Sequence, residues 1–64
     1  MTASNRLRLY RRFRETFRLR ERALETAMKL MEHARPAAAF LHAETARRLN
    51  RRVNALGRAL AQGE

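Results

Sequence analysis

The only proline of this chain, Pro36, stands between two long segments that both have the periodicity of a helix. Proline has no amide hydrogen to donate within a helix, and its ring disfavours helical geometry at the preceding residue, here Arg35. Proline is well tolerated at the first position of a helix. The stretch from His33 to Pro36 therefore predicts the end of one helix and the start of a second.

The segment before Pro36 has apolar residues at three- and four-residue intervals, the pattern of a helix that is buried along one side. They are Leu9, Phe13, Phe17, Leu24, Ala27, Met28 and Met31, with Tyr10 at the edge, and Leu19, Ala23 and Leu30 widen the arc to about half of the circumference. An arc this broad suggests contact with more than one neighbour. We expect a helix over about residues 4–33, with the side chain of Ser4, or of Thr2, accepting a hydrogen bond at its start.

The segment after Pro36 has a narrower apolar line, consisting of Ala39, His42, Ala46, Leu49, Val53, Leu56 and Leu60. This spacing suits coiled-coil-like packing. Gly57 either weakens the second helix or ends it, and the continuation to Leu60 favours a helix over about residues 36–61. We expect the fold to be held by Leu49, Val53, Leu56, Phe13, Phe17 and Met31.

Two polar residues fall on the apolar faces of the predicted helices, and one aromatic residue falls on a charged face. We expect Arg20 either to reach outward along its alkyl stem or to pair with an acid across an interface. His42 is expected to be packed rather than to bind a metal. Phe40 is expected to point to the charged side of the second helix.

We predict an all-α protein, one small domain over residues 1–64, in which a turn at about residues 33–36 joins the helices into an antiparallel hairpin. The alternative is one long helix, kinked at Pro36 and paired with another chain. A chain of 64 residues buries only about 60% of the surface that its unfolded form exposes. No cysteine is present to add a disulfide, so association is the remaining way to stabilise the fold. Two hairpins would form a four-helix bundle.

The chain is strongly basic, with 15 lysines and arginines against 6 acids and a net charge of +9. The first 32 residues carry nine basic and four acidic residues, and the last 32 carry six and two, so the excess is spread evenly along the sequence. A chain with this charge attracts polyanions: nucleic acid, an anionic membrane or an acidic protein.

The residues required for most kinds of catalysis are absent from the sequence. There is no Asp and no Cys, so neither a Ser-His-Asp nor a Cys-His arrangement can form within one chain. The glutamates are expected to pair along the helix, as in Glu25 with Lys29. His33 and His42 do not have helical ligand spacing, and no glycine-rich phosphate loop is present. We expect a non-enzymatic protein without a metal or cofactor.

The second predicted helix carries one concentrated group of bases, which we call the arginine patch: Arg47, Arg48, Arg51, Arg52 and Arg58. On a helix this patch faces away from the apolar line, and Glu44 is the only acid beside it. Asn50 and Asn54 border the patch with amides that can bond phosphates or base edges. Arginine binds phosphate through two parallel hydrogen bonds, so the pattern predicts binding of DNA or RNA. An acidic protein partner and an ordinary solvated helix face are the alternatives.

The N-terminal segment RLRLYRRFRETF contains Leu9-Tyr10-Arg11. This tripeptide resembles the signature of the LYR-motif family, which are small basic helical proteins of mitochondrial respiratory-complex and iron–sulfur assembly that bind acyl carrier protein. The family usually has three helices and a phenylalanine about thirty residues further on. Phe40 lies near that distance, but this chain has room for only two long helices. The resemblance implies that the tripeptide would face a partner protein in the mitochondrial matrix.

No apolar run approaches the 18 or more residues that span a bilayer; the longest, from Ala37 to Leu41, has five. We therefore expect a cytoplasmic protein, with the mitochondrial matrix as the alternative. A third candidate function is binding to the surface of an anionic membrane, with the broad apolar face of the first helix buried in the lipid.

Overall fold

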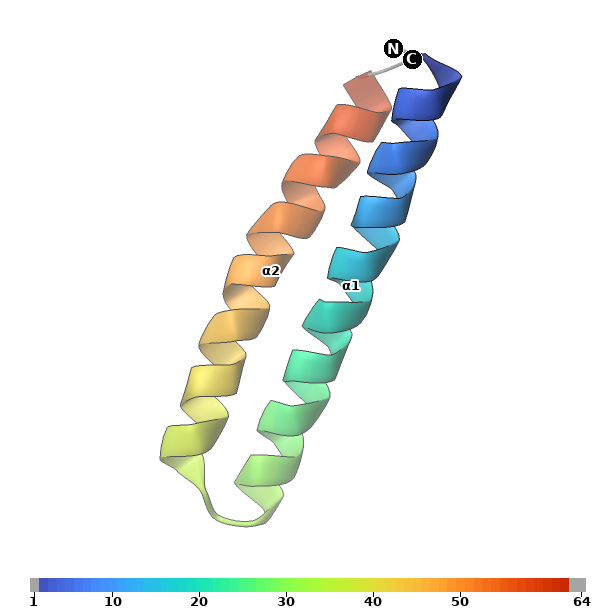
Figure 1. The fold of residues 1–64 in the computed structure, drawn as a ribbon. Helices are drawn as coiled ribbons and strands as arrows, with labels where there is room; N and C mark the ends of the chain where they lie inside the picture. Colours follow the sequence, from blue (N-terminus) through green and yellow to red (C-terminus); the bar gives the residue numbers. More distant parts are fainter. Residues whose placement is uncertain (1, 63–64) are drawn as a thin grey trace.

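The computed structural model describes residues 2–62 and consists of two antiparallel α-helices packed side by side along their whole length (Figure 1). Helix α1 spans Ala3–Glu32 and helix α2 spans Pro36–Gln62. The hairpin is elongated, with principal extents of 48 × 14 × 11 Å. The predicted all-α hairpin is confirmed, and the alternative of a single long helix kinked at Pro36 is wrong.

Helix α1 begins with a side-chain cap. The hydroxyl Oγ1 of Thr2 accepts a hydrogen bond of 3.2 Å from the backbone N–H of Asn5. This bond satisfies one of the amides that have no partner within the first turn. Thr2 is therefore the cap, and Ser4 lies inside the helix.

Helix α1 ends in a Schellman motif. The N–H of Arg35 donates to the carbonyl of Leu30 at 2.8 Å, and the N–H of Ala34 donates to the carbonyl of Met31 at 3.0 Å. Ala34 lies in the left-handed region with φ of 55°, a conformation that this motif requires and that usually belongs to glycine. The next helix then begins directly with a proline, whose missing N–H costs nothing at that position.

The buried core between the helices is made of small side chains: Ala23, Ala27, Ala39, Ala46 and Val53. Among residues 2–62, no large side chain is fully buried. Phe17 and Met31, which we expected to hold the fold, are exposed, so that prediction is wrong. The broad apolar arc of α1 contains two adjacent stripes, and α2 packs on the one with the smaller residues.

The expected apolar line of α2 is only partly buried. Leu49 and Leu56 are half-buried, as is Phe13 of α1, whereas His42 is exposed, so its predicted packing is wrong. Gly57 lies inside α2 and does not end it. A Cβ atom built on Gly57 would stand 3.6 Å from Cε2 of Phe13, so the phenylalanine ring lies over this glycine.

Arg20 lies between the helices with its side chain only 20% exposed. Its Nη1 donates a hydrogen bond of 2.7 Å to Oδ1 of Asn50 on α2, and its Nη2 lies 3.0 Å from Oε1 of Glu21. The guanidinium also stacks over the ring of Phe17, 4.4 Å from the ring centroid. Arg20 thus neither extends into solvent nor pairs with an acid across an interface. Its acidic partner is the next residue of its own helix.

Candidate nucleic-acid interface

The five side chains of the arginine patch are all exposed along α2. Arg47, Arg51 and Arg58 lie within about 40° of one another around the helix axis, because their spacings are close to whole numbers of turns. The first and last of these are about 16 Å apart along the axis at 1.5 Å per residue. The row is therefore long enough to meet several successive phosphates of a nucleic-acid strand.

One member of the arginine patch is paired within the protein. Nη1 of Arg47 lies 3.0 Å from Oε1 of Glu44, although the arginine side chain remains 69% exposed. Within the described part of the chain, Arg48, Arg51, Arg52 and Arg58 have no hydrogen bond or ion pair. Four guanidinium groups are thus available to an external anion without the loss of an internal contact.

The asparagines beside the patch have different roles. The side-chain oxygen of Asn50 accepts the hydrogen bond from Arg20, and the residue is half-buried, so this oxygen is not available as expected to bond a base edge. Asn54 is exposed. The sequence pattern could not separate the two, because the partner of Asn50 is thirty residues away on the other helix.

A polar hollow of about 240 Å³ between the helices brings one arginine of α1 next to the patch. It is lined by Arg12, Glu15, Thr16, Arg52 and Leu56. Arg12 is thus a candidate phosphate ligand that sequence reasoning did not single out, because only the packing of α1 on α2 shows that it shares a groove with Arg52. Glu15 is the one acid of this hollow.

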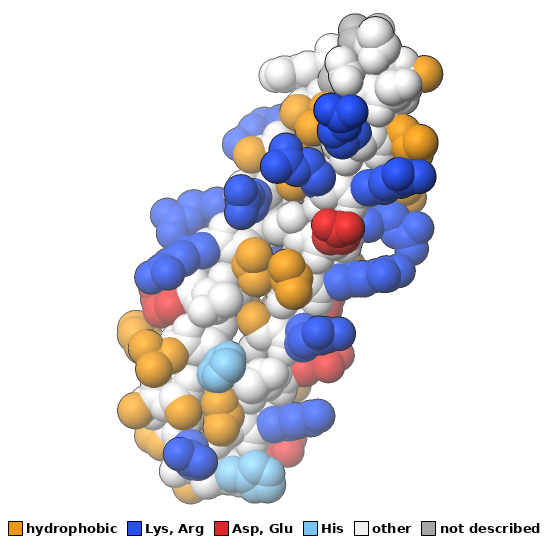
Figure 2. Space-filling view, in the orientation of Figure 1, with side chains coloured by type: hydrophobic (Ala, Val, Ile, Leu, Met, Phe, Trp, Pro, Cys, Tyr) orange, Lys and Arg blue, Asp and Glu red, His pale blue; other side chains and the backbone are white. Residues whose placement is uncertain are grey.

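The folded hairpin has a strong difference in charge between its two ends. The Arg20–Asn50 hydrogen bond marks one level along both helices. On the side of the termini, residues 2–19 and 51–62 contain nine basic residues and one acid, and on the side of the turn, residues 20–50 contain six and four. The excess of basic residues, which is spread evenly along the sequence, is therefore concentrated at one end of the folded hairpin. On the face drawn in Figure 2, basic side chains gather over both helices toward the end with the termini.

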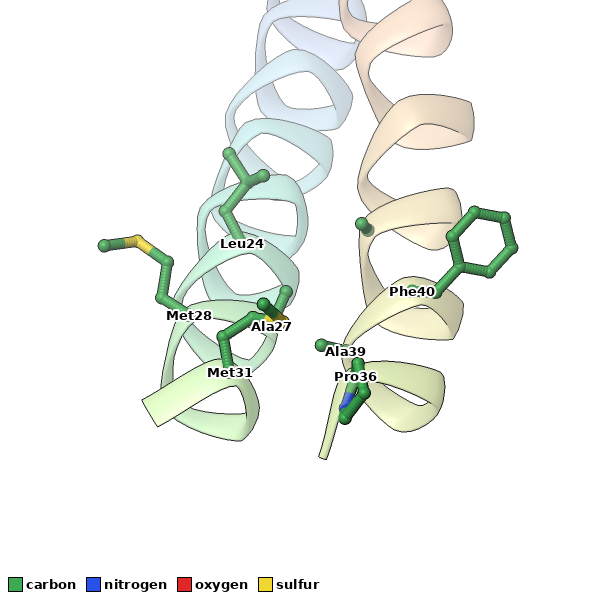
Figure 3. Close-up of a pocket in the computed structure, with 8 residues that line it drawn as sticks. Leu24, Ala27, Met28, Met31, Pro36, Ala39 and Phe40 are labelled. Atoms are coloured by element: carbon green, nitrogen blue, oxygen red, sulfur yellow. The ribbon is translucent and has the colours of Figure 1, made fainter. Parts of the chain in front are cut away.

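The opposite end of the hairpin has an apolar hollow of about 350 Å³ beside the turn, which we call the turn groove (Figure 3). It is lined by Leu24, Ala27, Met28, Met31, Pro36, Ala39, Phe40 and Ala43. Phe40 is 62% exposed and borders this groove, so it belongs to an apolar surface and does not interleave with the arginines. Stacking of Phe40 on a nucleic-acid base is therefore not supported by its surroundings.

The remaining titratable groups form no further site. Within residues 2–62, no three His, Cys, Asp or Glu side chains lie close enough to hold a metal ion. The expected pair of Glu25 and Lys29 is not formed, because the ion pairs among the described residues are those of Arg20 with Glu21 and of Arg47 with Glu44. Neither described helix has an apolar stretch long enough to cross a membrane.

Comparisons of the chain with protein-family models, with curated proteins and with solved structures gave no match. In the LYR-like tripeptide, Leu9 is half-buried against α2, while Tyr10 and Arg11 are exposed. Residues 2–62 form two helices, where the LYR-motif family usually has three. The resemblance to that family thus remains confined to the tripeptide and the distant Phe40.

Proposed function

We propose that this chain is a cytoplasmic, non-enzymatic protein that binds DNA or RNA through the phosphate backbone. The observation that carries the proposal is the set of four exposed arginines on α2 without an internal partner: Arg48, Arg51, Arg52 and Arg58. Three of them stand at the end of the hairpin that has nine bases and one acid. Arg47 and the neighbouring Arg12 of α1 complete the surface.

Arginine side chains suit this role for two physical reasons. The planar guanidinium can donate two parallel hydrogen bonds to one phosphate, and it is charged at every physiological pH. A surface that touches phosphates without reaching base edges binds with little choice of sequence. Its affinity falls steeply with salt concentration, because each phosphate that it neutralises releases a condensed counterion.

The proposal is tested by titrating labelled duplex DNA and single-stranded RNA with the protein at several salt concentrations. Five phosphate contacts on duplex DNA predict a slope of log affinity against log salt of about −4 to −5. The triple variant Arg48/Arg51/Arg52→Ala is expected to reduce the magnitude of this slope by about 3.

The matched control is the triple variant Arg22/Lys29/Arg35→Ala, which removes the same charge from exposed positions outside the patch. Circular dichroism of both variants verifies that the helices are retained. Equal losses of affinity in the two variants would show that only net charge matters and would contradict a site on α2. Failure to bind either nucleic acid at low salt, together with tight capture of an acidic protein, would replace the proposal with a protein-binding role.

A further inference from the structure

The large apolar side chains that remain exposed are gathered on one flank of α1. Six of the nine exposed large hydrophobic residues among residues 2–62 lie there: Leu7, Tyr10, Phe17, Leu24, Met28 and Met31. Met28, for example, is 66% exposed and points away from α2 in Figure 3. We call this surface the apolar flank. A strip of exposed large hydrophobic residues along one helix is unusual on a monomer and marks an interaction surface.

The apolar flank has the periodicity of a second helix-packing seam. Tyr10, Phe17, Leu24 and Met31 follow one another at intervals of seven residues. Each stands one residue after a member of the seam that faces α2, which contains Leu9, Thr16, Ala23 and Leu30. One residue of an α-helix turns the side chain by about 100°, so α1 has two seams at nearly a right angle. A helix with two such seams packs against two neighbours, as in a four-helix bundle.

We propose that the apolar flank binds the same flank of a second copy of this chain, with the two α1 helices antiparallel and related by a two-fold axis at Phe17. Antiparallel packing about this axis places Tyr10 at the level of the partner's Leu24, and Leu7 within one residue of the level of the partner's Met28. The proposed dimer deepens the proposed function, since it is the assembly that would carry the arginine patch. It does not require that the patch bind nucleic acid.

The charges on the flank select a second copy and its direction. Arg14 and Glu21 are the charged members of the heptad row that also contains Leu7 and Met28. Antiparallel packing places Arg14 near the partner's Glu21, whose carboxylate also pairs with Arg20 of the same helix, and by symmetry this contact forms twice. In parallel packing, Arg14 would instead face the partner's Arg14 and Glu21 would face the partner's Glu21, and both contacts between like charges are unfavourable.

The residues bordering the flank repeat this complementarity in part. On the next row around the helix, Arg11 and Arg18 stand in the first part of α1, and Glu25 and Glu32 stand in the second part. An antiparallel copy brings Arg11 opposite the partner's Glu25, and in the same register Arg18 lies opposite the partner's Arg18 near the axis. The same glutamates, together with Glu21 on the flank, would face the head groups of an anionic membrane, so the charge pattern favours a second copy over a lipid surface.

Two hollows lie at the ends of the flank, and the same alignment brings them together. Besides the turn groove, a second hollow of about 350 Å³ lies at the end with the termini and is lined by Ala3, Arg6, Leu7, Tyr10 and Leu60. Antiparallel packing brings the α1 residues of this hollow against the turn groove of the partner. Each end of the flank is therefore covered by the opposite end of the other copy.

The exposed area of the hairpin also fits a missing neighbour. The accessible surface is 5277 Å². A folded monomer of 7.5 kDa is expected to expose about 4,200 Å². The excess of roughly 1,000 Å² is close to the ~800 Å² that one partner buries in a protein–protein interface of standard size.

The two-fold axis places both α2 helices on the same side of the α1 pair, with their arginine patches near each other. Like charges on the two patches repel, and added salt screens that repulsion. Salt also screens the Arg–Glu contacts of the interface, but each chain carries a net charge of +9, so repulsion dominates. The dimer is therefore expected to become tighter as the salt concentration rises, whereas the binding of nucleic acid becomes weaker. Because salt acts in opposite directions on dimerisation and on nucleic-acid binding, an experiment can show that one of them fails while the other holds.

Sedimentation equilibrium of the full chain without nucleic acid tests the assembly. We expect a dimer at about 0.5 M salt and a weaker one at about 0.05 M. At about 0.15 M salt, Arg14→Glu is expected to weaken the dimer at least ~10-fold, because it faces the partner's Glu21 twice. The double variant Arg14→Glu/Glu21→Arg is expected to restore it, and circular dichroism verifies that the hairpin stays folded without the ion pair of Arg20 with Glu21. Arg22→Glu, the same charge change outside the flank, is the control.

The direction of packing is tested by disulfide crosslinking, because the chain has no cysteine of its own. A mixture of Tyr10→Cys and Leu24→Cys proteins is expected to crosslink faster than either variant alone. Equally fast crosslinking of Tyr10→Cys alone would overturn the antiparallel arrangement. A monomer at about 0.5 M salt that floats with phosphatidylserine vesicles would overturn the dimer in favour of a membrane surface.

Discussion

The guanidinium of Arg20 donates a hydrogen bond of 2.7 Å to the side-chain oxygen of Asn50 and so joins α1 to α2 between the two ends of the hairpin. The Nε atom of the same side chain is buried and has no partner among the described residues. This hydrogen bond, the ion pair with Glu21 and the stacking on Phe17 together offset the cost of placing a charged group between the helices.

Replacement of this acceptor should destabilise the hairpin. We expect Asn50→Ala to lower the free energy of unfolding by about 1–2 kcal/mol, because the charged donor loses its partner in a partly buried position. Asn54→Ala is the control, since Asn54 is exposed on the same helix and the change in helix propensity is the same. Urea denaturation of both variants measures the difference. Equal stability of the two would mean that the interhelical bond contributes nothing.

The turn between the helices can be improved by one substitution. Ala34 has φ of 55°, a conformation that glycine adopts without the steric cost that Cβ imposes. We expect Ala34→Gly to stabilise the hairpin by about 0.5–1 kcal/mol, a rise in Tm of several degrees for a domain of this size. Ala55→Gly, at an exposed position inside α2, should destabilise it by about 1 kcal/mol. A loss of stability in both variants would contradict the assigned turn geometry.

At Gly57 the opposite substitution, from glycine to alanine, is expected to stabilise the hairpin. A Cβ atom there would lie 3.6 Å from Phe13, which is an ordinary contact distance. Gly57→Ala is therefore expected to stabilise the hairpin by about 1 kcal/mol through helix propensity alone. Gly57→Leu should destabilise it by about 1–3 kcal/mol, because the longer side chain needs the space of the phenylalanine ring. Thermal unfolding followed by circular dichroism measures both, and equal tolerance of the two residues would contradict the packing of Phe13 on Gly57.

The ion pair of Glu44 with Arg47 provides a test of the arginine patch that increases binding instead of abolishing it. Glu44→Gln releases Arg47, so the slope of log affinity against log salt on duplex DNA should become steeper by up to about 1. Glu32→Gln removes the same charge from an exposed position at the end of α1, outside the patch, and should leave the slope unchanged. Fluorescence anisotropy titrations measure both variants. An identical slope in both would exclude Arg47 from the contact.

The helical hairpin could be predicted from local chemistry. Pro36 interrupts the helical pattern, and the observed helices, Ala3–Glu32 and Pro36–Gln62, lie close to the expected ranges of about 4–33 and 36–61. Which side of α1 faces α2 could not be predicted, because both sides of its broad arc are apolar. Phe17 and Ala23 belong to the same arc, yet α2 contacts the side of Ala23. Small side chains there allow the two backbones to approach closely.

The candidate site likewise has some features that could be predicted from the sequence and others that could not. The exposure of Arg51 and Arg58 follows from their position opposite the apolar line of α2, and the structure shows both exposed. The bond of Asn50 to Arg20 and the hollow shared by Arg12 and Arg52 depend on contacts between distant parts of the chain. A periodic pattern describes one helix at a time, so it contains no information about such contacts.

A buried core of four alanines and one valine has little surface relief, so the two helices could slide along each other with a small loss of contact. The ring of Phe13 prevents this, because it lies over Gly57, the one position of α2 without a side chain. A shift of α2 by one turn would bring Val53 or Leu60 beneath the ring instead. This single knob and hole therefore sets the axial register of the hairpin, and with it the level at which Arg12 stands beside Arg52.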